Sequence, residues 1–394
     1  TMSSKAMHGT ALIATMRREV RQLTSRALFL FCMVIAPVFC CLFFPSIMDM
    51  GLPQNLPAGI VDLDRTQTSR TIARHLNSME QTQIVKQFEN VREARLAVQR
   101  GEIYGYYYIP EGMTRDAYAQ KQPKLSFYTN YAYMVGGSLL FRDNKMISEL
   151  VAGAAARSQL YARGATESQA MDWLQPIVID THPIGNPWLN YSIYLSNIMI
   201  PGVLGLLIFM VTVCSIAMEI KRSTAREWME TAGGSMSIAL LGKLLPQTVA
   251  FMLIGTFIDV YLYGFLSYPI NGGFLPMLIV MYLFILACQG FGVLMFVTLP
   301  TMRLGLSFAS LWGIISFSIC GASFPALGMP TVMQSASVLF PLRHYYLSYV
   351  TSALDGFSLK YAWTNILAFV IFALLPLLLL RRLKHILLTY KYVS

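Results

Sequence analysis

Charged residues are scarce in this sequence of 394 residues. Lys, Arg, Asp and Glu make up 13% of its positions, whereas about a quarter of a typical soluble domain is charged. Hydrophobic residues reach 55%. Because long stretches of the chain need no water-facing charge, the composition predicts an integral membrane protein.

Catalytic signatures are also missing. The sequence contains no G-x-x-x-x-G-K-[ST] loop to cradle nucleotide phosphates, no G-x-S-x-G and no H-E-x-x-H. The six cysteines all lie in apolar runs without metal-ligand spacing, so we interpret them as small buried apolar residues. We therefore expect no catalytic residue, no metal site and no cofactor bound by this chain, and no ATP hydrolysis by it alone.

The formal net charge is +10, and the excess of basic residues is unevenly placed. Between residues 49 and 187 acidic and basic residues are about equal in number, so the excess lies beside the apolar runs. This placement favours contact with membrane phospholipid and not with nucleic acid.

Six apolar runs are long enough to cross about 30 Å of hydrocarbon at about 1.5 Å per residue. They predict an α-helical polytopic membrane protein with six transmembrane helices and an extracytoplasmic mixed α/β domain between the first and second. The predicted spans are Ala27–Met48, Leu195–Met218, Leu244–Leu266, Phe274–Leu299, Leu304–Cys320 and Ala362–Leu380. The predicted regions are an N-terminal cytoplasmic amphipathic helix (1–25), the first span (26–48), the extracytoplasmic domain (49–190) and a five-helix transmembrane region (191–394).

The N-terminal stretch Thr10–Ser25 has apolar residues at helical spacing. They are Leu12, Ile13, Met16, Val20 and Leu23, with Arg17, Arg18 and Arg21 on the opposite face. A basic amphipathic helix before a span is expected in the membrane interface, with its apolar side inward. In the first span itself, Pro37 predicts a bend.

The polar region between the first two spans alternates strands and helices. This order is typical of a small α/β or α+β domain. We interpret the tyrosines at 104 and 106–108 as packing a sheet face. The predicted elements are strands at Ala58–Leu63, Ile103–Ile109 and Leu125–Thr129, and helices at Ser69–Met79, Val91–Arg100 and Tyr133–Ala162.

Lysines and arginines in the short loops set the orientation. They gather before the first span, between the second and third, between the fourth and fifth, and after the sixth. Both termini are therefore predicted to be cytoplasmic, with the large domain outside, in a bacterial inner membrane. Arg343 and Lys360 are exceptions on the outer side.

Asp259 is the one acid within a predicted span. A charge there is costly, so the residue is a functional candidate by default; the alternative is that it reaches the interface or bonds Tyr261 or Tyr263. We group it with Asn197, Phe324 and Arg343 as candidate substrate-pathway residues. The apolar segment 321–350, broken by prolines, predicts short re-entrant helices in the outer leaflet.

The segment 219–231 and the start of the next helix carry a recognisable pattern. The stretch EIKRSTAREWMETAGGSMSIALLGKLLPQ resembles the coupling-helix region of type-2 ABC exporter permeases, roughly E-x-E-x-x-T-x-E-x-L-x-x-T-P-x-S followed by G-K-x-x-P. It departs from that pattern at Lys221, Trp228 and Gly233. The outer segment that begins GASFPALGMP resembles the family's re-entrant region and the helix after it. The domain opening AGIVDLDRTQTSR, with YYYIPEG later, is similar to the outer domain of the long-loop subfamily. The matching residues are Glu219, Thr224, Glu227, Thr231, Ser235, Gly242, Lys243 and Pro246.

The resemblance implies the membrane subunit of an ATP-driven exporter of amphipathic or hydrophobic, drug-like or lipid-like substrates. Two permease chains, as a homodimer or heterodimer, would each bind a separate ATPase subunit that holds ATP and magnesium, and a periplasmic adaptor could dock outside. The pathway would follow the first, second and fifth spans. ATPase coupling would fall to the helix Lys221–Met229; the coupling residues named are Glu219, Lys221, Arg222, Thr224, Arg226, Glu227, Trp228 and Met229.

Two other classes stay open from the sequence. One is a membrane-embedded enzyme acting on lipid, against which the lack of a His, Asp and Glu cluster in the spans counts. The other is a sensor or scaffold with an outer ligand-binding domain. ATPase stimulation by a co-expressed partner distinguishes a transporter from a sensor.

Overall fold

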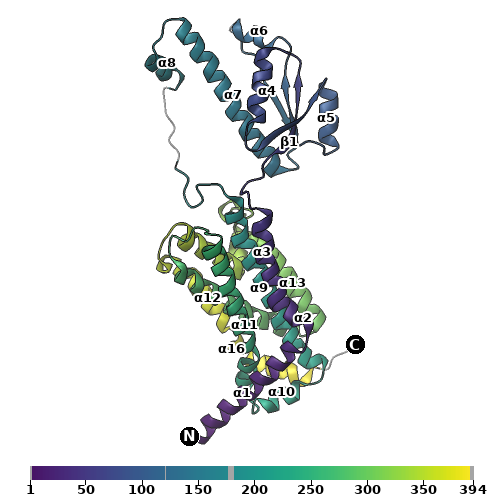
Figure 1. Cartoon of the computed structure of the whole chain (residues 1–394). Coiled ribbons are helices and arrows are strands. Elements are labelled where there is room, and N and C mark those ends of the chain that lie inside the picture. Colours follow the sequence, from purple (N-terminus) through teal and green to yellow (C-terminus); the bar gives the residue numbers. More distant parts are fainter. Residues whose placement is uncertain (1, 120, 176–181, 391–394) are drawn as a thin grey trace. The chain divides into compact units, whose positions relative to one another are not determined.

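The chain is described by a computed structural model covering residues 2–119, 121–175 and 182–390. It divides into two compact units. Unit 1 contains residues 1–49 and 183–394, and unit 2 contains residues 50–182. Unit 2 is thus inserted into the chain between the first two apolar helices of unit 1 (Figure 1).

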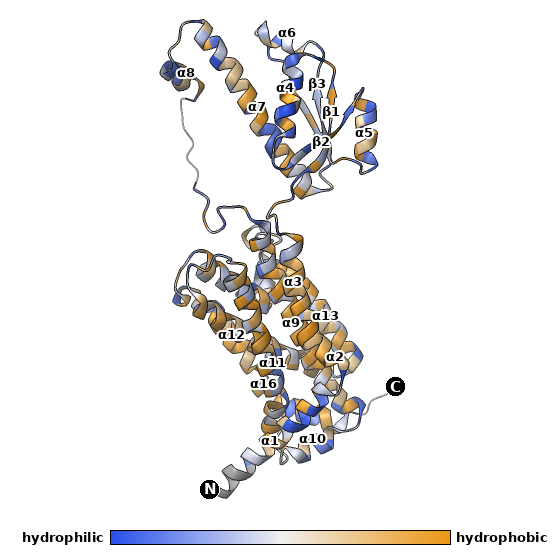
Figure 2. Ribbon diagram, in the orientation of Figure 1, coloured by the Kyte–Doolittle hydropathy of each residue, from blue (hydrophilic) through white to orange (hydrophobic). Residues whose placement is uncertain are grey.

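Unit 1 is helical, and its described residues contain six candidate spans, judged by length and composition. This finding confirms the prediction of a polytopic α-helical membrane protein. The spans are Ala27–Ile47, Tyr191–Lys221, Met236–Phe265, Phe274–Thr298, Met302–Ile319 and Leu359–Thr389. Figure 2 shows that their residues are mostly hydrophobic, whereas the end of the bundle that carries α1 and α10 is polar.

The helices of unit 1 follow the sequence with a few irregular turns. Pro37 lacks the N–H that an α-helix would pair with the carbonyl of Met33, and a π-helical turn at Phe31–Ile35 lies just before it. The elements are α1 (Met2–Thr24), α2 (Ala27–Leu30), η1 (Phe31–Ile35), α3 (Ala36–Ile47), α9 (Tyr191–Lys221), α10 (Ala225–Thr231), α11 (Met236–Asp259), η2 (Val260–Phe265), α12 (Phe274–Thr298), α13 (Met302–Ile319), η3 (Ala326–Gly328), α14 (Thr331–Ser337), α15 (Pro341–Tyr349), η4 (Val350–Leu354), η5 (Leu359–Ala362) and α16 (Trp363–Thr389).

The helix α1 packs on the bundle partly with polar side chains. Thr15, Glu19 and Leu23 are buried, whereas Ile13 and Val20 are exposed. The helix buries polar side chains against charged partners on other helices, as described below, and leaves apolar side chains outward, where hydrocarbon can cover them. Its place in the membrane interface stays a prediction.

Unit 2 is a four-stranded sheet with helices on both faces. The strand order is β2-β1-β3-β4, with β1 parallel to β2 and β3, and β4 antiparallel to β3. The sequence analysis missed β2, α6 and α8. The elements are β1 (Leu56–Asp62), α4 (Gln67–Asn77), β2 (Thr82–Phe88), α5 (Val91–Gln99), β3 (Gly105–Ile109), α6 (Met113–Tyr118), β4 (Ser126–Thr129), α7 (Met134–Ala162) and α8 (Glu167–Leu174).

The two faces of this sheet bury separate cores. Ile72 of α4 and Leu140 of α7 pack with Tyr107 on one face. Ala94 of α5 packs with Tyr106 on the other. The neighbouring tyrosines of β3 point to opposite faces, as successive strand residues must, and both are nearly inaccessible to solvent. Tyrosines 106 and 107 thus pack the sheet, as the sequence predicts.

Candidate functional site

The short helix α10 follows α9 after a tight turn. Ser223 adopts a positive φ between the two helices, and Gly233 and Gly234, both with positive φ, follow the end of α10. The helix therefore begins at Ala225, not at Lys221. Lys221 ends α9, and Arg222 is its C-cap.

The helix α10 has one buried and one charged face. Ala225, Trp228, Met229 and Ala232 are buried, and this spacing places them on one side of the helix. Arg226, Glu227 and Glu230 are exposed on the other side, and so are Lys221 and Arg222 before the helix.

Trp228 is anchored within its own chain. Its side chain is 0% exposed, and the indole Nε1 donates to the Ala239 carbonyl of α11 at 3.2 Å. Trp228 is therefore not available to fill a pocket of a partner, and we do not expect its replacement to spare folding. Truncating a buried tryptophan to alanine typically costs about 3–5 kcal/mol. Trp228 instead fixes α10 against the bundle.

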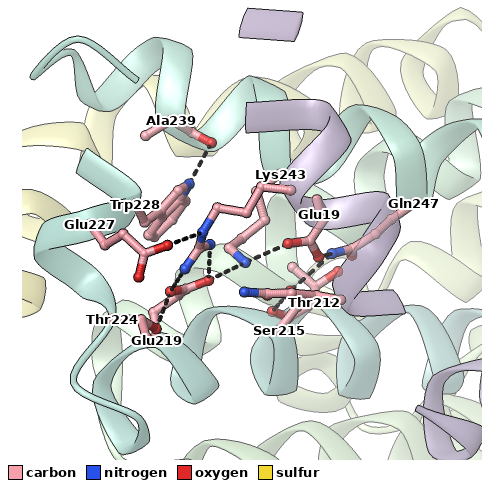
Figure 3. A network of polar contacts seen from close by, with 12 residues as sticks. Glu19, Thr212, Ser215, Glu219, Thr224, Glu227, Trp228, Ala239, Lys243 and Gln247 are labelled. Carbon is pink, nitrogen blue, oxygen red and sulfur yellow. Dashed lines mark hydrogen bonds and ion pairs between the residues drawn. The ribbon is translucent and has the colours of Figure 1, made fainter. Parts of the chain in front are cut away.

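Lys243 of α11 lies at the centre of a buried ion network (Figure 3). It is 0% exposed, and its Nζ donates to Glu19 Oε2 at 2.6 Å and to Glu219 Oε1 at 2.9 Å. The same ammonium lies 4.8 Å from the centre of the Trp228 ring. The two carboxylates come from α1 and α9, so this one lysine joins three helices.

Arg18 supplies the second positive charge. Its Nη1 and Nη2 donate to the two oxygens of Glu219 at 2.7 and 2.9 Å, and its Nε donates to Glu227 Oε1 on α10 at 3.4 Å. Burial alone would lower the pKa of Arg18, but its ion pairs with Glu219 and Glu227 outweigh burial and raise it. The guanidinium is therefore always charged, and it links α1 to α9 and α10.

Neutral side chains complete the network. Gln247 Nε2 donates to Glu19 Oε1 at 2.9 Å and to Ser215 Oγ at 3.0 Å, and Thr224 Oγ1 donates to Glu219 Oε2 at 2.6 Å. The buried charges balance, because two carboxylates face one lysine and one arginine. Removing one partner of such a buried ion pair costs about 3–5 kcal/mol of folding stability. These four side chains therefore hold their helices firmly together. We call the group Arg18, Glu19, Glu219 and Lys243 the ion latch.

Only part of the ion latch is predicted from the sequence. Glu219 is a predicted coupling residue, but the structure places it within α9 and almost fully buried, at 1% exposed. Lys243 matches the family pattern without a predicted role, and Arg18 and Glu19 have no predicted role at this site. Two signals were present: a single acid in a basic N-terminal helix, and a lysine near the start of an apolar run.

The candidate pathway residues lie elsewhere in unit 1. Asp259, near the end of α11, is 0% exposed, and neither carboxylate oxygen has a hydrogen-bond partner in the described chain. Asn197 is also 0% exposed, and its Oδ1 accepts from Tyr263 Oη at 2.9 Å. Asp259 and Tyr263 are four residues apart and interact electrostatically, so the structure brings Asp259 and Asn197 into one region.

The other two pathway candidates are not joined to this region. Phe324 is 53% exposed, in the segment between α13 and η3. Arg343 on α15 is partly buried, and its Nη1 has no hydrogen-bond partner among the described residues. Within the residues described, no hydrogen bond or ion pair connects Phe324 or Arg343 to Asp259.

Residues 27–381 match the family described as ABC-2 family transporter protein. The chain belongs to this family. The match includes unit 2 and nearly all of the six spans, so the inserted domain is part of the family match and not an unrelated addition. A comparison with curated proteins found no match.

Membership of the ABC-2 family makes this chain the multi-pass permease component of an ABC transporter, which associates with an ABC ATPase. This result confirms the type-2 ABC permease resemblance at the level of the family. The subfamily with a large outer domain stays a prediction. The helix α1 precedes the matched residues, although it supplies half of the ion latch.

Proposed function

We propose that this ABC-2 permease exports its substrate, and that α10, held by the ion latch, receives the motion of the ATPase. The carrying observation is the contrast between the two faces of α10: Trp228 fixes one face to α11, and the other presents Arg226 and Glu230, beside Glu227, which Arg18 of α1 holds. A rigid helix with an exposed charged face transmits a push to the bundle instead of absorbing it.

The proposed orientation places α1, α10 and the C-terminus in the cytoplasm. The loop between α9 and α11 carries several basic residues, which favours the cytoplasmic side, where an ATPase has access to ATP. Unit 2 then lies outside, in the periplasm if the cell has two membranes, where it can receive substrate or an adaptor. The rule that lysines and arginines mark the cytoplasmic side applies to short loops and not to long domains. The balanced charge of unit 2 is therefore compatible with this placement.

Two chains are proposed to form the working transporter. The first, fifth and sixth spans are only 22%, 28% and 17% buried within the chain, whereas the second is 72% buried. All three exposed spans offer surface for pairing, and we place the pairing surface and the substrate path along the first and fifth, which the family resemblance also implies. Apolar side chains exposed on these spans suit either lipid or a second permease chain.

Charge reversal on the exposed face of α10 tests the coupling role. Arg226→Glu combined with Glu230→Arg changes no buried group, so we expect normal folding but weak co-purification of the ATPase and little substrate-stimulated ATP turnover. Charged and arginine side chains often carry much of the energy of an interface. Arg92→Glu, on an exposed helical position of unit 2, is the matched control and should behave like the wild type.

Unchanged co-purification and turnover in the double reversal would place the ATPase contact elsewhere. Orientation is tested separately, by labelling Ser78→Cys and Ser223→Cys in intact cells with a reagent that does not cross membranes. Both positions are exposed in the structure. We expect the cysteine at 78 to be labelled; labelling of the cysteine at 223 alone would invert the proposed topology.

A further inference from the structure

One face of α15 and η4 carries buried hydroxyl groups that lack partners. Tyr345, Ser348, Tyr349 and Ser352 are each at most 1% exposed, and none of these hydroxyls has a hydrogen-bond partner in the described part of the chain. Their spacing places them on one side of the helix. An unmade hydrogen bond in a buried site costs about 1–3 kcal/mol, so four in a row call for an explanation.

Asp259 belongs to the same cluster. It interacts electrostatically with Tyr263 and Tyr345, and Tyr263 in turn interacts with Tyr349. The other titratable group that faces it is Cys41 of α3. Among the described residues no lysine or arginine pairs with Asp259, in contrast to every carboxylate of the ion latch.

The chemistry of the cluster indicates what its missing partner is. A buried carboxylate without a counter-charge is costly, so we expect Asp259 to keep its proton unless a cation pairs with it. A ligand that carries positive charge would restore the carboxylate by pairing with it. The rings of Tyr263, Tyr345 and Phe284, whose centroid lies 5.1 Å from that of Tyr345, offer aromatic faces that attract cations.

A metal ion fits this cluster poorly. Calcium takes about six to eight oxygen ligands and zinc about four N, S or O ligands. No group of three or more His, Cys, Asp or Glu side chains suited to a metal is found in the residues described. One carboxylate surrounded by aromatic rings suits a single positive charge on an organic molecule.

We propose that Asp259, Tyr263 and Tyr345 bind the cationic group of the transported substrate, and that binding displaces the proton of Asp259. The O–H bond of the carboxylic acid breaks, the proton leaves to water, and the carboxylate pairs with the cation, so the cluster stays neutral. This inference rests on the proposed function and narrows its substrates to amphipathic cations.

Tetraphenylphosphonium is the probe for this site, and tetraphenylborate, of nearly the same shape and opposite charge, is its counterpart. Binding is measured on the purified full-length chain in lipid nanodiscs, without ATPase or nucleotide. We expect Asp259→Asn to weaken tetraphenylphosphonium binding by about tenfold or more and to leave tetraphenylborate binding unchanged. In weak buffer near neutral pH, the wild type should release about one proton per cation bound, and Asp259→Asn none.

Three further variants guard against misfolding. Tyr345→Phe keeps the ring and removes only the hydroxyl, so it should bind the cation almost as well as the wild type, whereas Tyr345→Leu removes the ring and should bind it several-fold more weakly. Asp355→Asn removes an exposed acid of unit 1 and should leave cation binding unchanged. Failure of the wild type to bind tetraphenylphosphonium, equal binding by Asp259→Asn, or binding without proton release would each overturn the proposal.

These outcomes are independent of the proposed function. The binding experiment contains no ATPase, so loss of coupling cannot imitate loss of the cation site. Conversely, if the ATPase co-purifies through α10 but the cation binds equally to Asp259→Asn, the permease assignment stands and only the cation site falls.

Discussion

Unit 1 buries acidic side chains in two places, and it treats them in opposite ways. In the ion latch, Glu19 and Glu219 each meet a positive partner within 3 Å. At Asp259, in the same unit, neither oxygen meets any partner in the described chain. Since an unpaired buried charge is costly and a paired one is rigid, the first arrangement is suited to holding helices together and the second to receiving a ligand.

The largest effect expected from this comparison comes from breaking the ion latch at its centre. Lys243→Met removes the shared cation and leaves Glu19 without its charge partner. We expect a loss of about 3–5 kcal/mol in the free energy of unfolding. Thermal unfolding in detergent measures this loss, and Lys360→Met, at an exposed lysine, is the matched control. A melting temperature equal to that of the control would show that the latch is not structural.

A smaller effect is expected from forcing α1 away from α11. A Cβ atom on Gly242 would lie 2.6 Å from Thr15 Cβ, too close for any real contact, so Gly242→Ala must displace α1. Such overpacking costs about 1–3 kcal/mol. Trypsin should then cleave faster at Arg17 and Arg21. In Gly9→Ala the added Cβ would have no other atom within 4 Å, so trypsin should cleave this variant at the same rate as the wild type.

The same chemical change at the two sites sharpens the comparison. Asp259→Asn exchanges one unpartnered buried group for another of equal size, so we expect the free energy of unfolding to change by less than about 1 kcal/mol. Glu219→Gln should cost more, because it leaves Arg18 and Lys243 with excess positive charge. Equal losses in the two variants would contradict the distinction between a paired and an unpaired site.

The smallest effect concerns a carboxylate outside these two sites, in unit 2. Burial alone would raise the pKa of Asp64, but hydrogen bonds from Thr114 and Thr66 outweigh it and lower the pKa. A lowered pKa contributes stability above the unfolded pKa of about 3.9, and this contribution is lost as pH falls through the folded value. Asp64→Asn should therefore lower the melting temperature slightly at pH 7.

That difference should shrink as the pH falls below about 4, when both chains carry a neutral group. Thermal unfolding of the full chain at several pH values measures it. Glu149→Gln, at an exposed position of α7, should show no difference at any of these pH values. A deficit in Asp64→Asn that stays constant down to acidic pH would contradict this account of Asp64.

The sequence predicted the parts of this protein that local patterns determine. The apolar runs predicted all six spans. Two boundaries differ by more than a few residues, because α11 already begins at Met236, before the predicted start at Leu244, and α16 continues to Thr389, past the arginines that suggested an end at Leu380. The strand β2 was missed because its residues are mostly exposed, and an exposed edge strand carries no apolar alternation. Asp259 was identifiable because an acid within an apolar run is rare.

The ion latch could not be predicted from local patterns. Glu19 and Lys243 are separated by 224 positions, and only the packing of α1 on α11 brings them together. Arg18 was interpreted as part of a face exposed to headgroups, because a basic amphipathic helix has that appearance whether it lies on lipid or on protein. Trp228 was misplaced for a similar reason, since one turn of helix does not reveal which side the protein covers.

The contact between α10 and the ATPase is tested most directly by site-specific photo-crosslinking. A benzophenone amino acid is placed at Glu230 or Arg226 of α10 and, as controls, at Leu253, an exposed apolar position of α11, and at Ser168 of unit 2. We expect crosslinks to the ATPase subunit from positions 230 and 226 and from neither control. Crosslinking from Ser168, or none from α10 in a complex that still hydrolyses ATP, would contradict the account.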